Sequence, residues 1–485
     1  MNSEILRIYP NSIRVRGNSM FCIADADLRA DSSRVLAVFG PEMDLFEGKQ
    51  VSLQGRVYKL CPLNVENSKV IRRLFDFTNP VSYKGHNVTI GLGDRLGLAS
   101  AGHIRLIRDL DIFPVLAQQS MRELNLTGRT YEDVLADVVW AVFREGYTKG
   151  YGADGDHLKT FDEVKNALDC GYTMITLDCS EHIRNDLFTA DQTEINAQYL
   201  KLPADIKSSL ENTYLDKSIR LNGDAYIGFT ESELRRIALI YLPVIDHSIA
   251  VYERSLKGRE IDFEVSIDET LCVTSPQAHF FAANELFRRG VEISGIAPRF
   301  TGEFQKGIDY IGDISGFERD FAIHAGIAAR FGYRVSVHSG SDKFSIFPIV
   351  GRLSGGKYHL KTAGTSWLEA IRVIAANAPE LYREIHAFAL ENLSEARKYY
   401  HITEDVSDIA EISDAADDAL PGYLDQDSAR QALHITYGLI LSASARDGSP
   451  LFRDRISSAL RTYEAEYYEA LRKRLGRHLD ALGAR

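Results

Sequence analysis

The chain of 485 residues has little cysteine, and its cysteines follow no recognisable pattern. The five cysteines are odd in number and form no C-x-x-C pair, which argues against both a disulfide framework and a zinc ribbon. Basic side chains are also scarce, with 56 lysines and arginines against 68 aspartates and glutamates and a net charge of −12. Because this charge repels phosphate backbones and anionic membranes, we expect neither nucleic acid nor membrane among the partners.

Long apolar runs are missing as well. The most apolar segment, ALIYLPVI, is far shorter than the roughly 18 residues of a membrane span. The first residues, MNSEILRIYP, lack the basic region and apolar core of a secretory signal. Together with the cysteine pattern, these absences predict a cytoplasmic protein.

Sequence signatures of common enzyme classes give little evidence of function. The glycine-rich segments IGLGDRLG and RLSGGKYH do not give the G-x-G-x-x-G pattern with an acidic residue about twenty positions later, so nucleotide binding is poorly supported. Neither G-x-S-x-G nor H-E-x-x-H occurs, which removes the usual evidence for a serine hydrolase or a zinc protease. Evidence for function must therefore come from where polar residues fall in the fold.

Short apolar segments alternate with helix-length amphipathic stretches through the middle of the chain, which is typical of parallel β-α units. Their number and length predict a (β/α)8 TIM-type barrel, although an open doubly wound sheet would share the pattern. The predicted strands cover residues 88–93, 112–118, 146–154, 173–178, 261–268, 291–299, 333–340 and 357–364.

Three regions are expected around this pattern. Residues 1–87 form a small N-terminal β-rich module, residues 88–377 the catalytic barrel, and residues 378–485 a C-terminal helical extension. An insertion at about 184–229 is too long and polar for an ordinary β-α loop. We interpret it as a lid over the barrel mouth.

Polar side chains follow nearly every predicted strand at its carboxyl end, where barrel enzymes have their catalytic residues. His157, Glu264 and His338 supply imidazole and carboxylate from three different strands, a ligand set suited to Zn, Mn, Co or Ni. Asp154 or Asp156 would complete it. Each residue taken singly is equally compatible with a helix cap or an ordinary ion pair, so the prediction of a divalent metal depends on the set.

Cations stand in the same predicted mouth, which is otherwise rich in carboxylates. Arg299, Lys343 and Lys361 predict an anionic group in the ligand, because cations hold carboxylate or phosphate by charge-assisted hydrogen bonds. The alternative is that each cation neutralises a neighbouring acid. Gln119 and Ser120, at the end of the second strand, are further candidates for contact with the ligand.

Long stretches of the barrel region, from about Gly91 to Trp367, resemble the tagaturonate/fructuronate epimerase family. The resemblance implies an enzyme that interconverts two six-carbon keto-uronates, D-tagaturonate and D-fructuronate, with help from a divalent metal. The stretches are GLGDRLGLASAGHIR, PVLAQQSMRELNLTGRTYEDVLADVVWAVFREGYTKGYGADGDHLKT, FEVSIDET, SGIAPRFTGEFQKGIDYIGD, RVSVHSGSDKFSIFPI and YHLKTAGTSW.

The implied substrates make specific demands on the site. The two keto-uronates differ at a hydroxyl-bearing carbon one position beyond the carbon next to the ketone, where removal of the C–H proton gives no stabilised enolate. A retro-aldol cleavage and re-addition can invert this carbon, with a Lewis acid stabilising the enediolate. The resemblance thus assigns acid and base roles to Asp156, Asp268 and Glu269.

Other functions use similar parts. A metal-dependent aldolase of sugar acids would release the fragments, and a sugar isomerase would place its base beside the ketone. A non-catalytic sugar-binding protein would bind the ligand without turnover, which the polar strand ends disfavour.

Overall fold

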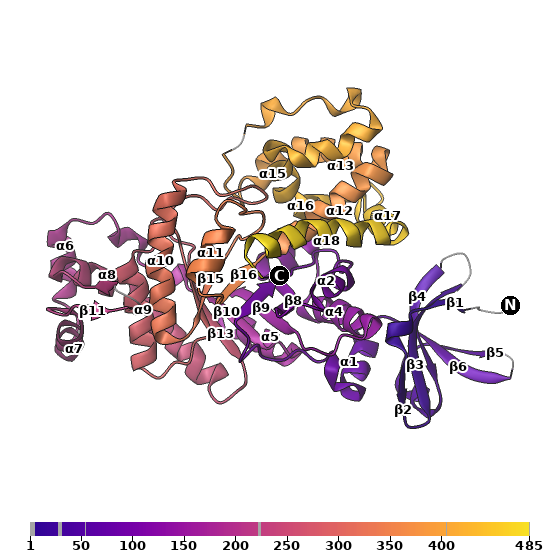
Figure 1. Cartoon of the computed structure of the whole chain (residues 1–485), viewed down its shortest axis with the longest axis horizontal. Helices are drawn as coiled ribbons and strands as arrows, with labels where there is room; N and C mark the ends of the chain where they lie inside the picture. Colours follow the sequence, from indigo (N-terminus) through magenta and orange to yellow (C-terminus); the bar gives the residue numbers. More distant parts are fainter. Residues whose placement is uncertain (1–4, 28–31, 54, 222–224, 404, 485) are drawn as a thin grey trace. The chain divides into compact units, whose positions relative to one another are not determined.

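The computed structural model of the protein describes residues 5–27, 32–53, 55–221, 225–403 and 405–484. Eight strands close into a barrel in the order β10-β13-β14-β15-β16-β7-β8-β9. The closed ring confirms the predicted (β/α)8 TIM-type barrel and excludes an open sheet (Figure 1). The strands are β7 (Val88–Gly91), β8 (Phe113–Ser120), β9 (Gly152–Leu158), β10 (Met174–Asp178), β13 (Asp262–Ile267), β14 (Gly295–Pro298), β15 (Arg334–Val337) and β16 (Tyr358–Lys361).

Burial on both faces explains the near-continuous apolar sequence of several strands. Strand β10 reads MITLD, and all five of its residues are buried. Its parallel register with β13 sets Thr176 opposite Glu264, and both side chains are fully buried. Polar groups inside such a barrel need partners, because burying an unpaired carboxylate is costly.

The chain forms two compact units. The first comprises residues 1–81, 92–153 and 363–476, and the second comprises residues 82–91, 154–362 and 477–485. The second unit thus contains most of the barrel strands together with the helices that follow β9, β10, β13, β14 and β15. Those helices are α5 (Phe161–Cys170), α6 (Gln192–Tyr199), α7 (Ala204–Tyr214), α8 (Glu231–Val251), α9 (Pro276–Arg288), α10 (Ile314–Phe331) and α11 (Phe347–Leu353).

Local sequence signals fix where several of these helices begin and end. Thr160 and Glu163 form a capping box at the start of α5, in which each side chain accepts from the other residue's backbone N–H. Ser275 caps α9, and Pro276 occupies its first turn, where a missing N–H costs nothing. Gly332 ends α10 in the left-handed conformation that glycine adopts most readily.

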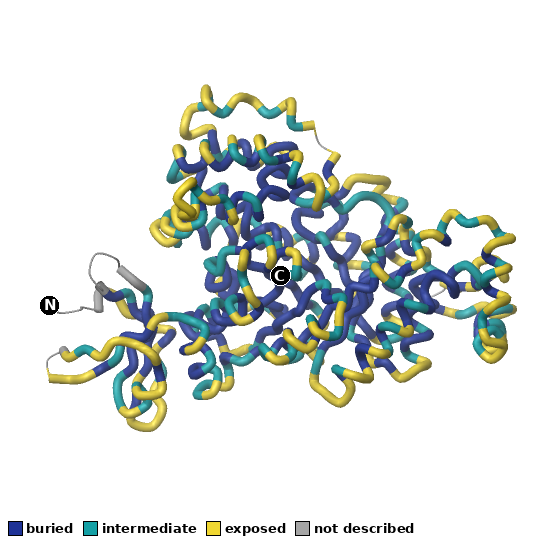
Figure 2. Tube along the Cα trace, turned by 180° about the vertical axis from the view of Figure 1, so that it is seen from behind, coloured by how far each residue is buried: buried dark blue, intermediate teal, exposed yellow. Residues whose placement is uncertain are grey.

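The N-terminal part of the first unit is an antiparallel six-stranded sheet, with the strand order β1-β3-β4-β6-β5 and β2 paired to β3. A small core of Cys22, Val35, Ala37, Tyr58 and Leu60 holds it together. Figure 2 shows a buried centre and exposed hairpin ends in this sheet, next to the label N. Its elements are β1 (Ile5–Ile8), β2 (Arg14–Arg16), β3 (Ser19–Asp27), β4 (Ser32–Phe39), β5 (Lys49–Leu53), β6 (Arg56–Pro62) and the helix α1 (Val65–Leu74).

The remaining helices of the first unit follow β7, β8 and β16 along the chain. Leu393, Ala396, Ala432 and Ile435 form a small core among the C-terminal ones, whereas the acidic stretch before α15 is largely exposed. None of the helices among the described residues has both the length and the apolar composition needed to cross a bilayer. The helices are α2 (Ser100–Ile107), α3 (Met121–Thr127), α4 (Tyr131–Glu145), α12 (Ala363–Asn377), α13 (Pro379–Glu391), α14 (Leu393–Ala396), α15 (Asp427–Ile435), α16 (Tyr437–Ser442), α17 (Arg453–Thr462) and α18 (Glu464–Ala481).

The predicted insertion at 184–229 contains α6 and α7 and a two-stranded hairpin of β11 (Ile219–Arg220) and β12 (Tyr226–Ile227). These elements lie beside α8 and α9 (Figure 1). The hydroxyl of Tyr214 at the end of α7 donates to Glu285 of α9 at 2.7 Å. This anchoring to outer helices argues against the predicted lid, while the domain boundaries themselves stay a prediction.

Candidate active site

Lys361 occupies the centre of a buried cluster of acids in the second unit. Its Nζ atom lies 3.0 Å from Asp154, 2.6 Å from Asp156 and 3.1 Å from Glu264, and it also donates to Thr176 at 2.7 Å. The acids come from β9 and β13, and the lysine is the last residue of β16. One ammonium group thus serves three carboxylates, which offsets the cost of burying them.

Burial and this ammonium group together set the ionisation of the acids. Burial raises the pKa of Asp154 to about 6, even though Lys361 acts to lower it. The effect of burial on Asp156 is overcome by Lys361, so the pKa of Asp156 lies below its usual range. Lys361 likewise outweighs burial at Glu264 and lowers its pKa well below the ordinary value. Asp156 and Glu264 are therefore anions at neutral pH.

His338 bridges two of the acids. Its Nε2 atom lies 2.8 Å from Oε1 of Glu264, and its Nδ1 atom lies 3.1 Å from Oδ2 of Asp268. Burial would lower the pKa of this histidine, but the carboxylate of Asp268 raises it to about 10. His338 is accordingly an imidazolium at neutral pH, and two of the three predicted metal ligands, Glu264 and His338, are bonded to each other. As metal ligands they stay a prediction.

His157, the third predicted ligand, has an unusual environment. Its φ of 54° lies in the left-handed region, which non-glycine residues seldom occupy away from functional sites. Its ring packs edge-on against His338, with the ring centroids 4.9 Å apart. The buried Nδ1 atom lies 3.8 Å from Asp178, too far for a hydrogen bond, and no other acceptor among the described residues reaches it.

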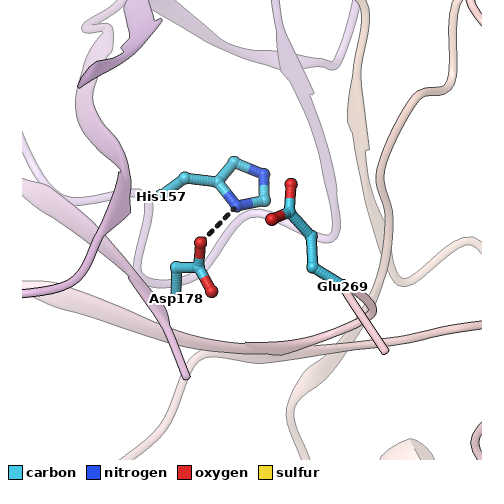
Figure 3. Close-up of side chains that lie close together, drawn as sticks. All are labelled: His157, Asp178 and Glu269. Atoms are coloured by element: carbon cyan, nitrogen blue, oxygen red, sulfur yellow. Dashed lines mark ion pairs between the residues drawn. The ribbon is translucent and has the colours of Figure 1, made fainter. Parts of the chain in front are cut away.

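The Nδ1 atom of His157 and Asp178 form an ion pair at 3.8 Å, and further possible ligand atoms lie close by. One ligand atom each from His157, Asp178 and Glu269 lie within 4.8 Å of one another (Figure 3). They come from the ends of β9 and β10 and from the loop after β13. A mixed set of imidazole and carboxylate suits the divalent metals named above, so the residues present fit such an ion.

The group of His157, Asp178 and Glu269 shares only His157 with the set of metal ligands predicted from the sequence. Asp178 is the last residue of β10 and is not among the ligands predicted from the sequence, whereas Glu269 is predicted as an acid or base. The sequence signal that marks Asp178 is its place as the last residue of an apolar strand. That signal does not distinguish a ligand from a residue that pairs with a neighbouring cation.

The two predicted anion-binding lysines, Lys343 and Lys361, form hydrogen bonds and ion pairs within the protein. Lys343 is fully buried, and its Nζ donates to the carbonyl oxygens of Gln305 at 2.8 Å, Ile308 at 2.5 Å and Ser341 at 3.0 Å. These three hydrogen bonds hold the loops of Lys343 together. Its contact with a ligand stays a prediction. Lys361 instead shows the alternative weighed in the sequence, since it neutralises neighbouring acids.

Arg299, the third predicted cation, follows β14 and is half-buried. One of its Nη atoms donates to the carbonyl oxygen of Thr270. Its backbone N–H donates to the hydroxyl of Thr274 at 3.0 Å, which fixes the start of the loop. A guanidinium carries five N–H groups, so Arg299 retains donors for an anion.

Gln119 and Ser120 belong to the first unit. Gln119 is fully buried, and neither of its amide atoms has a hydrogen-bond partner among the described residues. Ser120 caps α3 and accepts from the backbone N–H of Glu123 at 3.2 Å. Ser120 thus has a structural task, whereas the buried amide of Gln119 has donors and acceptors to offer. Their contact with a ligand stays a prediction.

Comparison with known proteins gives consistent matches along nearly the whole chain. Residues 9–482 match the family described as tagaturonate epimerase. The tagaturonate/fructuronate epimerase of Thermotoga maritima is 41% identical over 481 residues, which cover 98% of this chain and 96% of that protein. Crystal structures of the fructuronate-tagaturonate epimerase UxaE of Cohnella laeviribosi, native and with one glycerol, each have a TM-score of 0.94, 47% identity and coverage of 99% and 97% of the two chains. These matches confirm the resemblance seen in the sequence.

Proposed function

The chain belongs to the tagaturonate epimerase family, and we propose that it interconverts D-tagaturonate and D-fructuronate by a metal-dependent retro-aldol reaction. The observation that carries the proposal is the 41% identity, over 98% of this chain, with a relative named for both keto-uronates. The ligand is accordingly a small sugar acid. The charged groups at the strand ends of the second unit support the mechanism.

The reaction begins at the hydroxyl of the carbon to be inverted. A carboxylate takes the hydroxyl proton, the carbon becomes an aldehyde, and the bond to its neighbour breaks. The electron pair of that bond passes to the neighbouring carbon, which forms an enediolate with the former ketone. The aldehyde fragment then rotates and presents its other face to the enediolate. The carbon–carbon bond forms again on that face, and the new alkoxide takes up a proton.

Asp156 and Asp268 are the carboxylates that we propose for these proton transfers. Asp268 lies 3.1 Å from the Nδ1 atom of His338, and the positive charges of Lys361, His157 and His338 lower the pKa of Asp156. Asp156 is ionised at neutral pH and hydrogen-bonded to Lys361, so it is in the charge state that a proton acceptor needs. The new alkoxide is a far stronger base than Asp268, so it takes up its proton from the imidazolium of His338, which Asp268 holds in place.

We propose that His157, Asp178 and Glu269 hold the divalent metal. When bound there, the metal supplies a Lewis acid that stabilises the negative charge on the enediolate oxygens. The negative potential of the surrounding carboxylates favours a cation, and it also raises the pKa of His157 against the effect of burial. Arg299 keeps donors for the carboxylate of the substrate, as predicted from the sequence.

Product analysis tests the function directly. The purified protein with added divalent metal should convert either keto-uronate into the other, with both resolved by chromatography. Accumulation of three-carbon fragments in place of the epimer would indicate an aldolase. Binding of either keto-uronate without turnover, and without any effect of a chelator, would indicate a sugar-binding protein and overturn the proposal.

A further inference from the structure

We propose that Thr176 is a positioning residue for the proton transfers, and that its hydroxyl holds the ammonium of Lys361 against Asp156. This inference rests on the proposed function, because it concerns how the same site orients its proton acceptor. Thr176 is the middle residue of β10 and is fully buried. It is not among the site residues predicted from the sequence.

Thr176 lies opposite an irregularity in the neighbouring strand β9. The register of the two strands shifts between Ile175 and Leu177, so two residues of β9, Asp156 and His157, face the single residue Thr176. This arrangement is a β-bulge, which bends a strand and changes the direction of its side chains. The left-handed φ of His157 belongs to the same feature. Thr176 is thus the residue of β10 that faces the bulge carrying the proposed proton acceptor.

On its other side β10 pairs with β13, and the register sets Thr176 opposite Glu264. The Oγ1 atom of Thr176 lies 3.0 Å from Oδ1 of Asp154 and 3.3 Å from Oε1 of Glu264. The same atom accepts from Nζ of Lys361 at 2.7 Å. Thr176 therefore contacts two of the three carboxylates of the cluster and also the ammonium group that they share.

The hydroxyl of Thr176 carries one hydrogen, so it donates to one of these acids at a time. Oε1 of Glu264 already accepts from Nε2 of His338 at 2.8 Å and lies 3.1 Å from Nζ of Lys361. Asp154 is the closer acceptor. We infer that the hydroxyl donates to Asp154 while it accepts from Lys361, which fixes the hydroxyl in one orientation.

This fixed hydroxyl determines where the ammonium of Lys361 lies. Its Nζ atom makes directed hydrogen bonds to Oδ1 of Asp156 at 2.6 Å and to Thr176. Asp154 and Glu264 are slightly farther from it, at 3.0 and 3.1 Å. A lysine ammonium is a compact charge on a flexible stem. Without the hydroxyl it is free to move toward either of these acids, and its hydrogen bond to Asp156 weakens.

The orientation of Asp156 matters because a general base must lie within hydrogen-bond reach of the proton that it takes. A displacement of about 1 Å at such a group can lower the rate about 100-fold. Thr176 is fully buried, and its hydroxyl is used by two protein groups, so it acts through Lys361 and not on the substrate.

The test removes the hydroxyl and keeps the shape of the side chain. Thr176→Val is isosteric with threonine, Thr176→Ser keeps the hydroxyl, and Thr89→Val is the matched control. Thr89 is a fully buried threonine of β7 whose hydroxyl lies 2.8 Å from Nδ1 of His359. The readouts are kcat and KM for D-fructuronate, with the melting temperature as the check on folding. Thr176→Ala, with its smaller side chain, is a second hydroxyl-free variant in case Thr176→Val does not fold.

Thr176→Val should lower kcat by about 10- to 100-fold and change KM by less than about threefold, because the position of the proton acceptor affects the reaction and not substrate binding. Thr176→Ser should restore kcat to within about threefold of wild type. Thr89→Val should keep the kcat of wild type, although it also loses a buried hydrogen bond.

Wild-type kcat in folded Thr176→Val or Thr176→Ala would overturn the inference. An equal loss of kcat in Thr176→Ser and Thr176→Val would overturn it as well, because the methyl group and not the hydroxyl would then be responsible. The same loss in Thr89→Val would assign the effect to the general packing of the barrel. The proposed function fails separately, if the wild-type protein does not interconvert the two keto-uronates.

Discussion

The Nε2 atom of His338 lies 2.8 Å from Oε1 of Glu264, although the two residues are 74 positions apart in the chain. Glu264 is in β13 and His338 follows β15, so the bond reaches across β14, the strand between them in the barrel order. The same glutamate oxygen is 3.1 Å from Lys361. Glu264 is thus fixed between two cations, which makes it a poor candidate for binding a metal ion as a third cation.

The first prediction concerns which residues bind the metal. His157→Ala, Asp178→Asn and Glu269→Gln should each lower bound metal at least about tenfold, because each removes one N or O ligand. Glu264→Gln should retain the metal and lose activity through the changed charge around Lys361. Elemental analysis before and after dialysis against a chelator measures both effects.

Metal loss in Glu264→Gln and His338→Asn, with metal kept in Asp178→Asn, would restore the ligand set predicted from the sequence. His157 belongs to both sets, so its variant distinguishes a metal site from no metal site at all.

The second prediction concerns the stability provided by Lys361. Lys361→Met removes the single ammonium group among Asp154, Asp156 and Glu264, and breaking a buried ion pair in this way costs about 3–5 kcal/mol. Proton uptake by the carboxylates offsets part of the loss at low pH, so the destabilisation should be smaller at pH 5 than at pH 8. Denaturant unfolding at the two pH values measures this, with Lys357→Met as the control. An equal loss at both pH values would contradict the electrostatic explanation.

The third prediction concerns Asp262 at the start of β13. Burial raises the pKa of this carboxyl to about 6, even though it accepts from the backbone N–H of Tyr83 at 2.8 Å and the hydroxyl of Ser82 at 2.9 Å. Between about pH 4 and 6 the folded protein binds a proton that the unfolded chain has released. The contribution of Asp262 to the free energy of unfolding therefore falls as pH rises through that window, by about 3 kcal/mol in all.

Asp262→Asn should lack this contribution, because the amide does not ionise. The free energy of unfolding of the variant, measured relative to that of wild type, should therefore increase between pH 4 and pH 7. Above pH 7 this difference should stay constant. Urea titrations at closely spaced pH values give the difference. A constant difference across the window would show that Asp262 keeps an ordinary acidity in the folded protein.

The fourth prediction concerns the hydrogen on the inverted carbon. In the retro-aldol reaction only the hydroxyl proton and a carbon–carbon bond change at this position, so its C–H bond survives. Turnover in heavy water should leave the epimerised carbon unlabelled in the product, as read by nuclear magnetic resonance. Deuterium at that carbon in step with turnover would indicate direct deprotonation and would remove the roles proposed for Asp156 and Asp268.

The sequence by itself determined the barrel, because the evidence for its strands and helices is local. Strand β10 is mostly apolar, which suits burial on both faces, and Thr160 and Ser275 cap helices through contacts within three residues. The polar ends of the strands were visible for the same reason. A parallel barrel brings such ends together whatever the loops do, so a group of charged strand ends that includes His157 was predictable.

Only the tertiary structure decided the partner of each charge. Lys361 and Asp156 are 205 positions apart, and Lys343 and Gln305 are 38 apart, so no sequence spacing shows that one lysine meets carboxylates and the other meets carbonyl oxygens. The amino-acid composition supplies the charged groups. Their burial and the distances between them set their pKa values and their partners, and these arise only when the strands and loops pack together.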